Sequence, residues 1–253
     1  PIERMVSWMV GREVRDLYPR SARQAGEVLL EVTGLAGRGG KPVDAALELR
    51  RGEVVGIAGL MGAGRTEFLR CMFGLDAVRR GRVRVGAYCG PASPVRRWGQ
   101  GVGMLSEDRK QEGLALSLSV ADNVTLPRLG ALGRFGWVAP RSQMKSTQRW
   151  IDRLGIRCRG PGQRVHALSG GNQQKVAMAR LLQSDVDVLL LDEPTRGIDV
   201  AAKATIYELM DELASGRGRE GGRPRSILVI SSYLPELLGV CDRVAVMCRG
   251  RLG

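Results

Sequence analysis

One segment constrains the fold more than any other, because a run of apolar residues leads without a break into a glycine-rich loop that opens a helix. The apolar run is Val54–Ala58, the loop covers residues 59–66, and helical spacing of apolar residues continues to residue 74. Strand, loop and helix in this order form a cradle for phosphate, since the loop N–H groups and the helix N-terminus both carry positive partial charge. The segment therefore predicts an α/β protein with a phosphate-binding loop.

The loop reads Gly59-Leu-Met-Gly-Ala-Gly-Arg-Thr66 and departs from the pattern G-x-x-x-x-G-K-[ST] at one position. Arg65 stands where a lysine reaches the β- and γ-phosphates, and its planar guanidinium does not reproduce the position of a compact ammonium. The Thr66 hydroxyl remains suited to binding Mg²⁺. Glycine loops between a strand and a helix also arise from tight packing alone, so the loop by itself leaves that alternative open.

Composition favours a packed α/β protein over disordered, fibrous or disulfide-rich classes. The chain has 253 residues, of which 43% are hydrophobic, enough to bury one sizeable core. Five cysteines form an odd set without a C-x-x-C pair and one histidine is present, so we expect reduced thiols rather than a metal site. Without a signal peptide or an apolar run near the ~20 residues that cross a bilayer, we expect a soluble, cytoplasmic chain.

The chain is basic, with 39 Lys and Arg against 26 Asp and Glu and a formal net charge of +13. Such a charge attracts nucleic acid, anionic lipid or nucleotide, although a solvated arginine-rich surface explains it equally well. The basic clusters at residues 79–84, 96–97 and 217–225 lack interleaved aromatic residues. We therefore expect no nucleic-acid partner.

Along the chain, a possible linker precedes two stretches of β/α pattern that flank a helical segment. Residues 1–26 indicate a linker with helical turns near residues 5–10, and residues 119–157 carry helical signals, with Ser119 as a helix cap. We expect strands at residues 28–32, 54–58, 186–191, 227–230 and 243–248, helices at 67–74, 172–182 and 200–213, a turn at 37–40, and an exposed, mobile loop at 215–225. The nearly unbroken apolar strands predict a parallel sheet covered on both faces.

Two carboxylates, Asp192 and Glu193, follow the apolar strand that ends at Leu191. At the carboxyl edge of a parallel sheet, one carboxylate can hold Mg²⁺ while the next orients or deprotonates an attacking water. The alternative is that both residues only begin a turn before Pro194.

A serine and two glycines, Ser169, Gly170 and Gly171, open another predicted helix. The glycines let backbone N–H groups approach an anion, the serine offers a hydroxyl, and the helix dipole adds positive potential. The alternative is an ordinary serine N-cap, which does not call for two following glycines because glycine disfavours helix.

Taken in order, these motifs resemble those of ATP-binding cassette (ABC) ATPases. Residues 168–175 resemble the signature sequence, residues 188–194 the Walker B strand, and residues 59–66 a variant Walker A loop. Residues 105–110 and 192–199 narrow the resemblance to the second, C-terminal cassette of the two-cassette subunits that drive bacterial monosaccharide importers. The resemblance implies a P-loop NTPase fold with a mainly parallel sheet, an antiparallel β portion and a helical lobe at about residues 115–170. It also implies a linker at 1–26 and a cassette at 27–253, cut from a longer chain.

The resemblance further implies ATP and Mg²⁺ as cofactors and gives roles to individual residues. Thr66 and Asp192 take the magnesium position and Glu193 that of the catalytic carboxylate. Glu107 stands in place of the Q-loop glutamine and Ser232 in place of the switch histidine. The implied nucleotide contacts are Gly59, Gly62, Ala63, Gly64, Arg65, Thr66, Ser169, Gly170, Gly171 and Gln173, with Asp199 in the D-loop.

In this family two cassettes pair head to tail, so the implied partners are an upstream or second cassette, transmembrane permease subunits and, indirectly, a sugar-binding protein. The implied location is the cytoplasmic face of the plasma membrane. Because Arg65, Glu107 and Ser232 are non-standard, we expect the intact signature loop to complete the partner cassette's site and the isolated domain to hydrolyse ATP slowly. The alternatives are a non-hydrolytic nucleotide-binding module, a nucleoside importer and a DNA-associated ABC ATPase.

Overall fold

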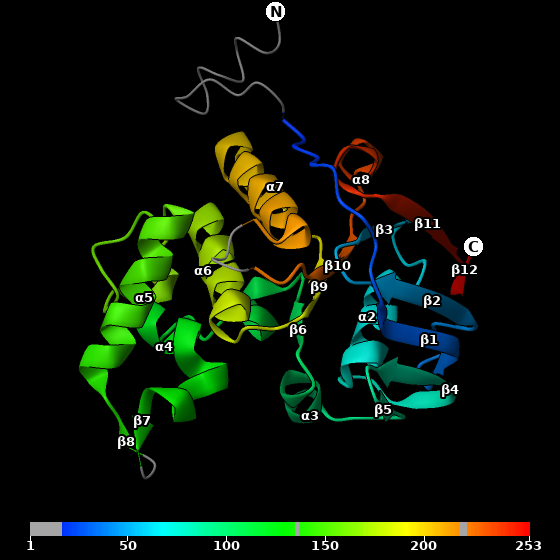
Figure 1. Cartoon of the computed structure of the whole chain (residues 1–253), viewed down its shortest axis with the longest axis horizontal. Helices are drawn as coiled ribbons and strands as arrows, with labels where there is room; N and C mark the ends of the chain where they lie inside the picture. The colour runs from blue at the N-terminus through cyan, green and yellow to red at the C-terminus, as the bar shows by residue number, and fades with distance from the viewer. Residues whose placement is uncertain (1–16, 135–136, 218–221) are drawn as a thin grey trace, which may run out of the picture. The chain divides into compact units, whose positions relative to one another are not determined.

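The computed structural model describes residues 17–134, 137–217 and 222–253, which fall into two compact units (Figure 1). The sheet unit contains residues 17–104, 186–194 and 207–253, and the helical unit contains residues 105–185 and 195–206. The helical turns expected near residues 5–10, and the tip of the loop expected at 215–225, lie outside the described residues.

The main sheet of the sheet unit has six strands in the order β12-β11-β3-β10-β9-β6. Its strands are β3 (Val54–Ala58), β6 (Val102–Leu105), β9 (Val188–Asp192), β10 (Ser226–Ile230), β11 (Arg243–Cys248) and β12 (Arg251–Leu252). β11, β3, β10 and β9 run parallel to one another, and every residue of β9 and β10 is buried. The parallel sheet expected from the apolar runs is therefore confirmed.

A second, antiparallel sheet has the order β2-β1-β4-β5. Its strands are β1 (Val28–Gly37), β2 (Ala45–Arg50), β4 (Val78–Val85) and β5 (Tyr88–Cys89). The strand expected at residues 28–32 extends to Gly37, because β2 pairs with it as far as Leu35 and β4 as far as Gly37. The turn expected at residues 37–40 follows β1, but the sequence analysis did not predict β2, which lies between that turn and β3.

The sheet unit also contains α2 (Arg65–Phe73), α3 (Pro94–Gly99), α8 (Leu234–Val240) and residues 207–215 of a longer helix. The apolar face of α2 buries Phe68, Leu69 and Met72 in one core with residues of β1, β3 and β4. Burial of each such side chain stabilises the fold by about 1.5–3 kcal/mol. The core therefore fixes α2, and with it the end of the glycine loop, against the strands.

The helical unit contains α4 (Val120–Thr125), α5 (Pro140–Leu154), α6 (Gly170–Gln183) and the first seven residues of α7 (Val200–Ser215). Ser119 begins α4 with a capping box to Asp122, as predicted. In α5, within the segment that carries helical signals, Thr147, Ile151 and Leu154 lie on one face and are buried, whereas Met144 is 43% exposed. Shorter elements are Arg109–Gly113, Leu126–Leu132, β7 (Gly133–Arg134), β8 (Trp137–Val138) and Val165–Ala167.

All five cysteines are free thiols in the structure. Within residues 17–134, 137–217 and 222–253, no helix has both the length and the apolar run that a bilayer crossing needs.

Candidate functional site

The phosphate loop, residues 59–66, joins β3 to α2 in the sheet unit. Its backbone requires glycine: Gly62 and Gly64 have φ of 75° and 108°, and a Cβ on Gly59 would lie 2.5 Å from the carbonyl oxygen of Met247. The N–H of Gly250 donates to the Ala63 carbonyl at 2.7 Å, which ties the loop to the turn after β11. The loop is thus shaped by neighbouring backbone, and its glycines are not interchangeable with alanine.

Arg65 begins α2 and points its guanidinium at protein groups. One terminal nitrogen donates to the carbonyl oxygen of Ser231 at 2.8 Å, and the other lies 3.6 Å from the Glu193 carboxylate. The side chain is 10% exposed. The residue that replaces the phosphate-binding lysine is therefore engaged with the sheet edge, where a polar group buried without partners would be costly.

Asp192, the last residue of β9, carries a carboxylate at the carboxyl edge of the parallel sheet. It is fully buried, and neither of its carboxylate oxygens has a hydrogen-bond partner. Burial raises the pKa of this carboxyl to about 6, with the nearby Thr66 hydroxyl opposing the shift. A buried carboxylate without partners, next to a hydroxyl on the phosphate loop, has the hard oxygen donors that Mg²⁺ prefers.

Glu193 lies beside Asp192 with a φ of 46°, and its side chain meets two other predicted site residues. The Ser232 hydroxyl donates to one carboxylate oxygen at 3.3 Å, and Arg65 faces the other. Burial raises the pKa of Glu193, with Ser232 and then Arg65 opposing the shift. A carboxylate with a raised pKa is suited to take a proton from water, but here a cation already neutralises it.

Sequence reasoning missed the support for the 231–232 segment. The Ser231 hydroxyl donates to buried Glu236 at 2.6 Å, and the N–H of Tyr233 donates back to Ser231 at 3.1 Å. These bonds hold the carbonyl that receives Arg65. Glu236 offers no signal in the sequence, because an acidic residue in the first turn of a short helix is ordinary.

The signature loop, residues 168–175, opens α6 in the helical unit. Ser169 takes the N-cap position but makes no side-chain cap, and its exposed hydroxyl accepts only from the Asn172 amide at 2.9 Å. The ordinary-cap alternative is therefore wrong. Gly171 packs closely, since a Cβ there would lie 3.1 Å from Ala202 and 3.3 Å from Asp199.

Two side chains, Gln173 and Arg109, donate hydrogen bonds to backbone carbonyls in or beside the signature loop. Buried Gln173 donates to the carbonyls of Val165 and Leu168 at 3.3 and 3.2 Å, so its polar contacts are with the loop's own backbone. Arg109 donates to the Gly170 carbonyl at 3.1 Å and to Gln174 at 3.3 Å. Arg109 was not among the predicted site residues, although it lies within the 105–110 motif.

The remaining predicted residues of the helical unit have partners there. Exposed Glu107 forms an ion pair with Arg196, and Asp199 accepts from the N–H of Ala202 at 2.9 Å at the start of α7. The chain's histidine, His166, is exposed, and its Nδ1 lies 3.3 Å from the Leu116 carbonyl oxygen.

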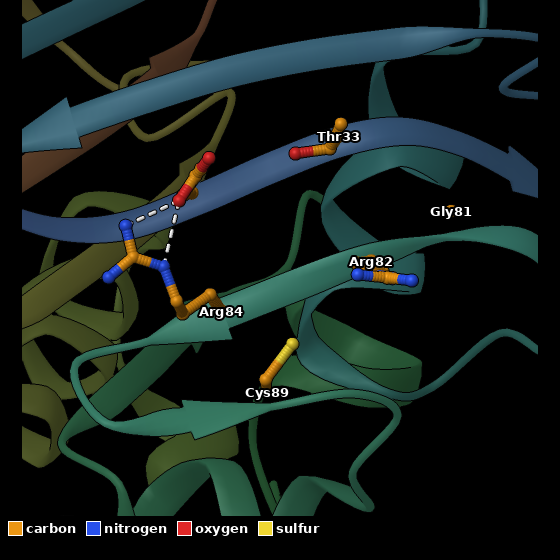
Figure 2. Close-up of a pocket in the computed structure, with 6 residues that line it drawn as sticks. Thr33, Gly81, Arg82, Arg84 and Cys89 are labelled. Carbon is orange, nitrogen blue, oxygen red and sulfur yellow. Dashed lines mark hydrogen bonds and ion pairs between the residues drawn. The ribbon is translucent and has the colours of Figure 1, made fainter.

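A hollow of about 360 Å³ on the antiparallel sheet contains none of the predicted site residues. Figure 2 shows Arg84 of β4 bonded to a carboxylate, which belongs to Glu31 of β1; Arg82 also lies on β4, and Cys89 lies on β5. The predicted basic cluster at 79–84 thus belongs to a strand, and part of its charge is paired with acidic neighbours.

A glycine loop that joins a central parallel strand to a helix defines the P-loop class of nucleotide-binding proteins, and the sheet unit has this arrangement. Within that class the chain belongs to the ABC transporter family of ATPases, whose model matches residues 43–196.

Curated relatives align with nearly the whole chain. Ribose import ATP-binding protein RbsA 2 of Streptomyces coelicolor is 46% identical over 258 residues, covering 100% of this chain and 47% of the relative. RbsA 2 of Rubrobacter xylanophilus is 47% identical, and the corresponding coverages are 99% and 47%. The chain therefore spans about half the length of these relatives.

Solved structures show the same fold. A nucleotide-free ATP-binding cassette from an ABC transporter has a TM-score of 0.73 at 18% identity, covering 89% of this chain and 90% of that one. The cassette MJ0796, in a dimeric post-hydrolysis state bound to ADP and Pi, has a TM-score of 0.73 at 20% identity, with coverages of 88% and 96%.

Proposed function

We propose that this chain is the nucleotide-binding cassette of an ABC importer for simple sugars, and that it is the C-terminal cassette of a two-cassette subunit. The relatives named as ribose import ATP-binding proteins support the sugar importer, and their length leaves room for a second cassette. Arg65, Glu107 and Ser232, each non-standard for a self-sufficient site, support the C-terminal position. In this proposal residues 1–26 link the cassettes and residues 27–253 form the second one.

ATP with Mg²⁺ fits the sheet unit. The amides of residues 62–66 at the start of α2 bind the phosphates, and Gly59 keeps the loop in shape. Thr66 and Asp192 are the residues that would hold Mg²⁺, because Asp192 is buried with no other partner. A bound Mg²⁺ supplies charge neutralisation to the phosphates. Glu193, at the position of the general base, orients water only when Arg65 leaves its carboxylate free.

The contact between Arg65 and Glu193 is the observation that supports different roles for this chain's own nucleotide site and for its signature loop. It occupies the carboxylate that this chain's own site would use, so that site is weak or regulatory. At the start of α6, Ser169 is exposed and makes no helix cap, and its hydroxyl accepts a hydrogen bond only from the neutral amide of Asn172. We propose that Ser169 and the glycines after it serve ATP held by the upstream cassette in a head-to-tail pair, with Asp199 at the shared interface.

The proposal places the chain at the cytoplasmic face of the membrane, bound to permease subunits that accept sugar from a binding protein. The second candidate is a module that binds nucleotide without any hydrolysis depending on this chain. The same contact between Arg65 and Glu193 favours it. The two candidate functions make different predictions for the signature loop, because only the importer cassette needs this loop for ATP hydrolysis.

The test compares steady-state ATPase activity of two variants in the two-cassette subunit assembled with its membrane partners. Gly171→Asp places a carboxylate in the signature loop and should lower activity by about a hundredfold or more, the scale for losing a preorganised anion contact. Arg65→Ala removes a cation from a site that is already weak and should change activity by less than about threefold.

The side chain added by Gly171→Asp would also crowd Ala202 and Asp199. A second variant therefore separates the effect of the added charge from the effect of disturbed packing. Ser169→Asp retains a good N-cap residue at an exposed position while adding the same charge. It should lower activity as Gly171→Asp does, without loss of thermal stability. Equal damage from Arg65→Ala would show that this chain's own site is the working one.

A further inference from the structure

A lysine from outside the phosphate loop lies against it. Half-buried Lys41, in the connection between β1 and β2, directs its Nζ to the carbonyl oxygen of Gly62. Its stem also packs on the loop, because a Cβ built on Gly64 would lie 3.2 Å from the Cβ of Lys41. Lys41 and the loop belong to the same compact unit, and both contacts bring an ammonium to the glycines that would cradle phosphate.

The backbone around Lys41 fixes this placement. The N–H of Val43 donates to the carbonyl of Gly250 at 2.7 Å, and the N–H of Gly250 donates to the Ala63 carbonyl at 2.7 Å. On the other side, a Cβ on Gly37 would lie 2.2 Å from the Lys41 carbonyl oxygen, so the close approach depends on glycine. Lys41 is therefore held by a chain of backbone bonds that ends on the loop itself.

The loop lacks the lysine that its pattern calls for, and Arg65 does not replace it. The guanidinium of Arg65 is bound to Ser231 and faces Glu193. In the same unit the fully buried Asp192 carboxylate has no hydrogen-bond partner, an independent sign that a ligand completes this site. The cation at position 65 is therefore bound to other protein groups, whereas the ammonium of Lys41 lies beside the loop.

We propose that Lys41 supplies the ammonium that binds the phosphates of a nucleoside di- or triphosphate on the loop 59–66. The inference rests on the nucleotide binding proposed above. Nζ exchanges the neutral Gly62 carbonyl for a phosphate oxygen, which makes a stronger, charge-assisted hydrogen bond. The flexible four-carbon stem of lysine permits this short movement, while its packing on Gly64 keeps the ammonium near the loop.

The test measures affinities of the purified chain for MgATP, MgADP and adenosine by calorimetry. Lys41→Met removes the charge and keeps most of the stem. It should weaken binding of MgATP and MgADP by about ten- to a hundredfold, the range for a hydrogen bond to a charged group. Adenosine binding should change by less than about twofold. Lys41→Arg should retain part of the affinity for the phosphorylated ligands.

The matched control is Arg38→Met, which removes one positive charge from an exposed position on the same connection. It should leave all three affinities unchanged. Thermal unfolding of each variant without nucleotide checks that the fold is intact, and Lys41→Gln replaces Lys41→Met if the latter is destabilised.

Three outcomes would overturn the role of Lys41: wild-type affinity in Lys41→Met, an equal loss for adenosine, or an equal loss in Arg38→Met. A wild-type chain that binds neither MgATP nor MgADP would instead remove the proposed function on which the inference rests.

Discussion

The phosphate loop and the signature loop are both glycine-rich starts of helices, yet the chain surrounds them differently. The phosphate loop is enclosed: Met247 and Gly250 contact its backbone, and Arg65 is bound at the sheet edge. The signature loop receives bonds from Gln173 and Arg109, and its leading serine is exposed.

This difference separates two uses of one backbone motif. A loop enclosed by its own chain has a ligand position defined within that chain, and the unpartnered carboxylate of Asp192 belongs to it. A loop whose leading serine is exposed and makes no helix cap is suited to a ligand carried by another molecule. The contrast agrees with the proposal that the two loops serve different ATP molecules.

The largest expected difference in stability is between alanine substitutions in the two loops, Gly59→Ala in the phosphate loop and Gly170→Ala in the signature loop. Gly59→Ala would place a Cβ 2.5 Å from the Met247 carbonyl, and backbone on both sides must move. We expect unfolding free energy to fall by at least about 3 kcal/mol, which lowers Tm by roughly 6–12 °C for a domain of this size. Differential scanning calorimetry measures the change.

Gly170→Ala is the matched control, because its Cβ would meet nothing nearer than 3.5 Å. Alanine also favours helix over glycine by up to about 1 kcal/mol, so Tm should stay level or rise. Equal losses in the two variants would mean that the enclosed and open loops do not differ as described.

A smaller effect is expected from Asp192→Asn, which removes a buried charge without partners. The carboxyl pKa is 3.8 when exposed and about 6 in the fold, a difference worth about 3 kcal/mol or less at neutral pH. The folded state binds the extra proton between these values, so the wild type loses stability as pH rises through that window. Asp192→Asn should therefore raise Tm without Mg²⁺ above pH 6 and have little effect below pH 4.

Asp211→Asn provides the opposite case in the same unit. Asp211 is also buried, but Ser21 donates to it and Arg23 pairs with it at 2.9 Å. Its substitution should lower Tm at neutral pH, because the buried side chain of Arg23 loses one of its two carboxylate partners and keeps only Asp242, at 3.0 Å. If Asp192→Asn lowers Tm as well, the Asp192 carboxylate has a structural partner and the magnesium assignment loses its support.

Sequence patterns predicted the strands with long apolar runs but missed the short β6, although all four of its residues are buried. β3, β9 and β10 were predicted because continuous apolar runs lie in a sheet that is covered on both faces. β2 was missed, although its residues alternate strictly between buried and exposed. β4 was interpreted as a basic cluster. Its arginines at 79, 80, 82 and 84 are exposed, and only Val83 and Val85 of the strand are buried, so it lacks a clear apolar pattern.

The site was predicted as a set of motifs rather than as a set of contacts. The adjacency of Glu193 and Ser232 follows from two neighbouring parallel strands, β9 and β10, that end at one edge. The bond from Arg65 to Ser231 joins residues 166 positions apart, and nothing in the local sequence specifies it. Lys41 was missed for the same reason, because its approach to the loop depends on the turn at Gly250.

The smallest expected effect distinguishes two serines that both occupy N-cap positions in the helical unit. Ser119 accepts from the N–H of Asp122 and completes a capping box, whereas Ser169 makes no cap. Ser119→Ala should therefore cost about 1 kcal/mol and lower Tm by roughly 2–4 °C. Ser169→Ala should cost less than about 0.5 kcal/mol, as at an ordinary surface position.

Thermal unfolding of the two variants and the wild type, in one buffer without nucleotide, measures both values. The order of the two effects should reverse in an activity assay, where Ser169→Ala is expected to be the more damaging variant. In the assembled two-cassette subunit, Ser169→Ala should lower ATPase activity several-fold because a hydroxyl donor to phosphate is lost, while Ser119→Ala should leave it unchanged. A Tm loss for Ser169→Ala equal to that of Ser119→Ala would mean that Ser169 caps α6 in solution and that the signature loop is not open.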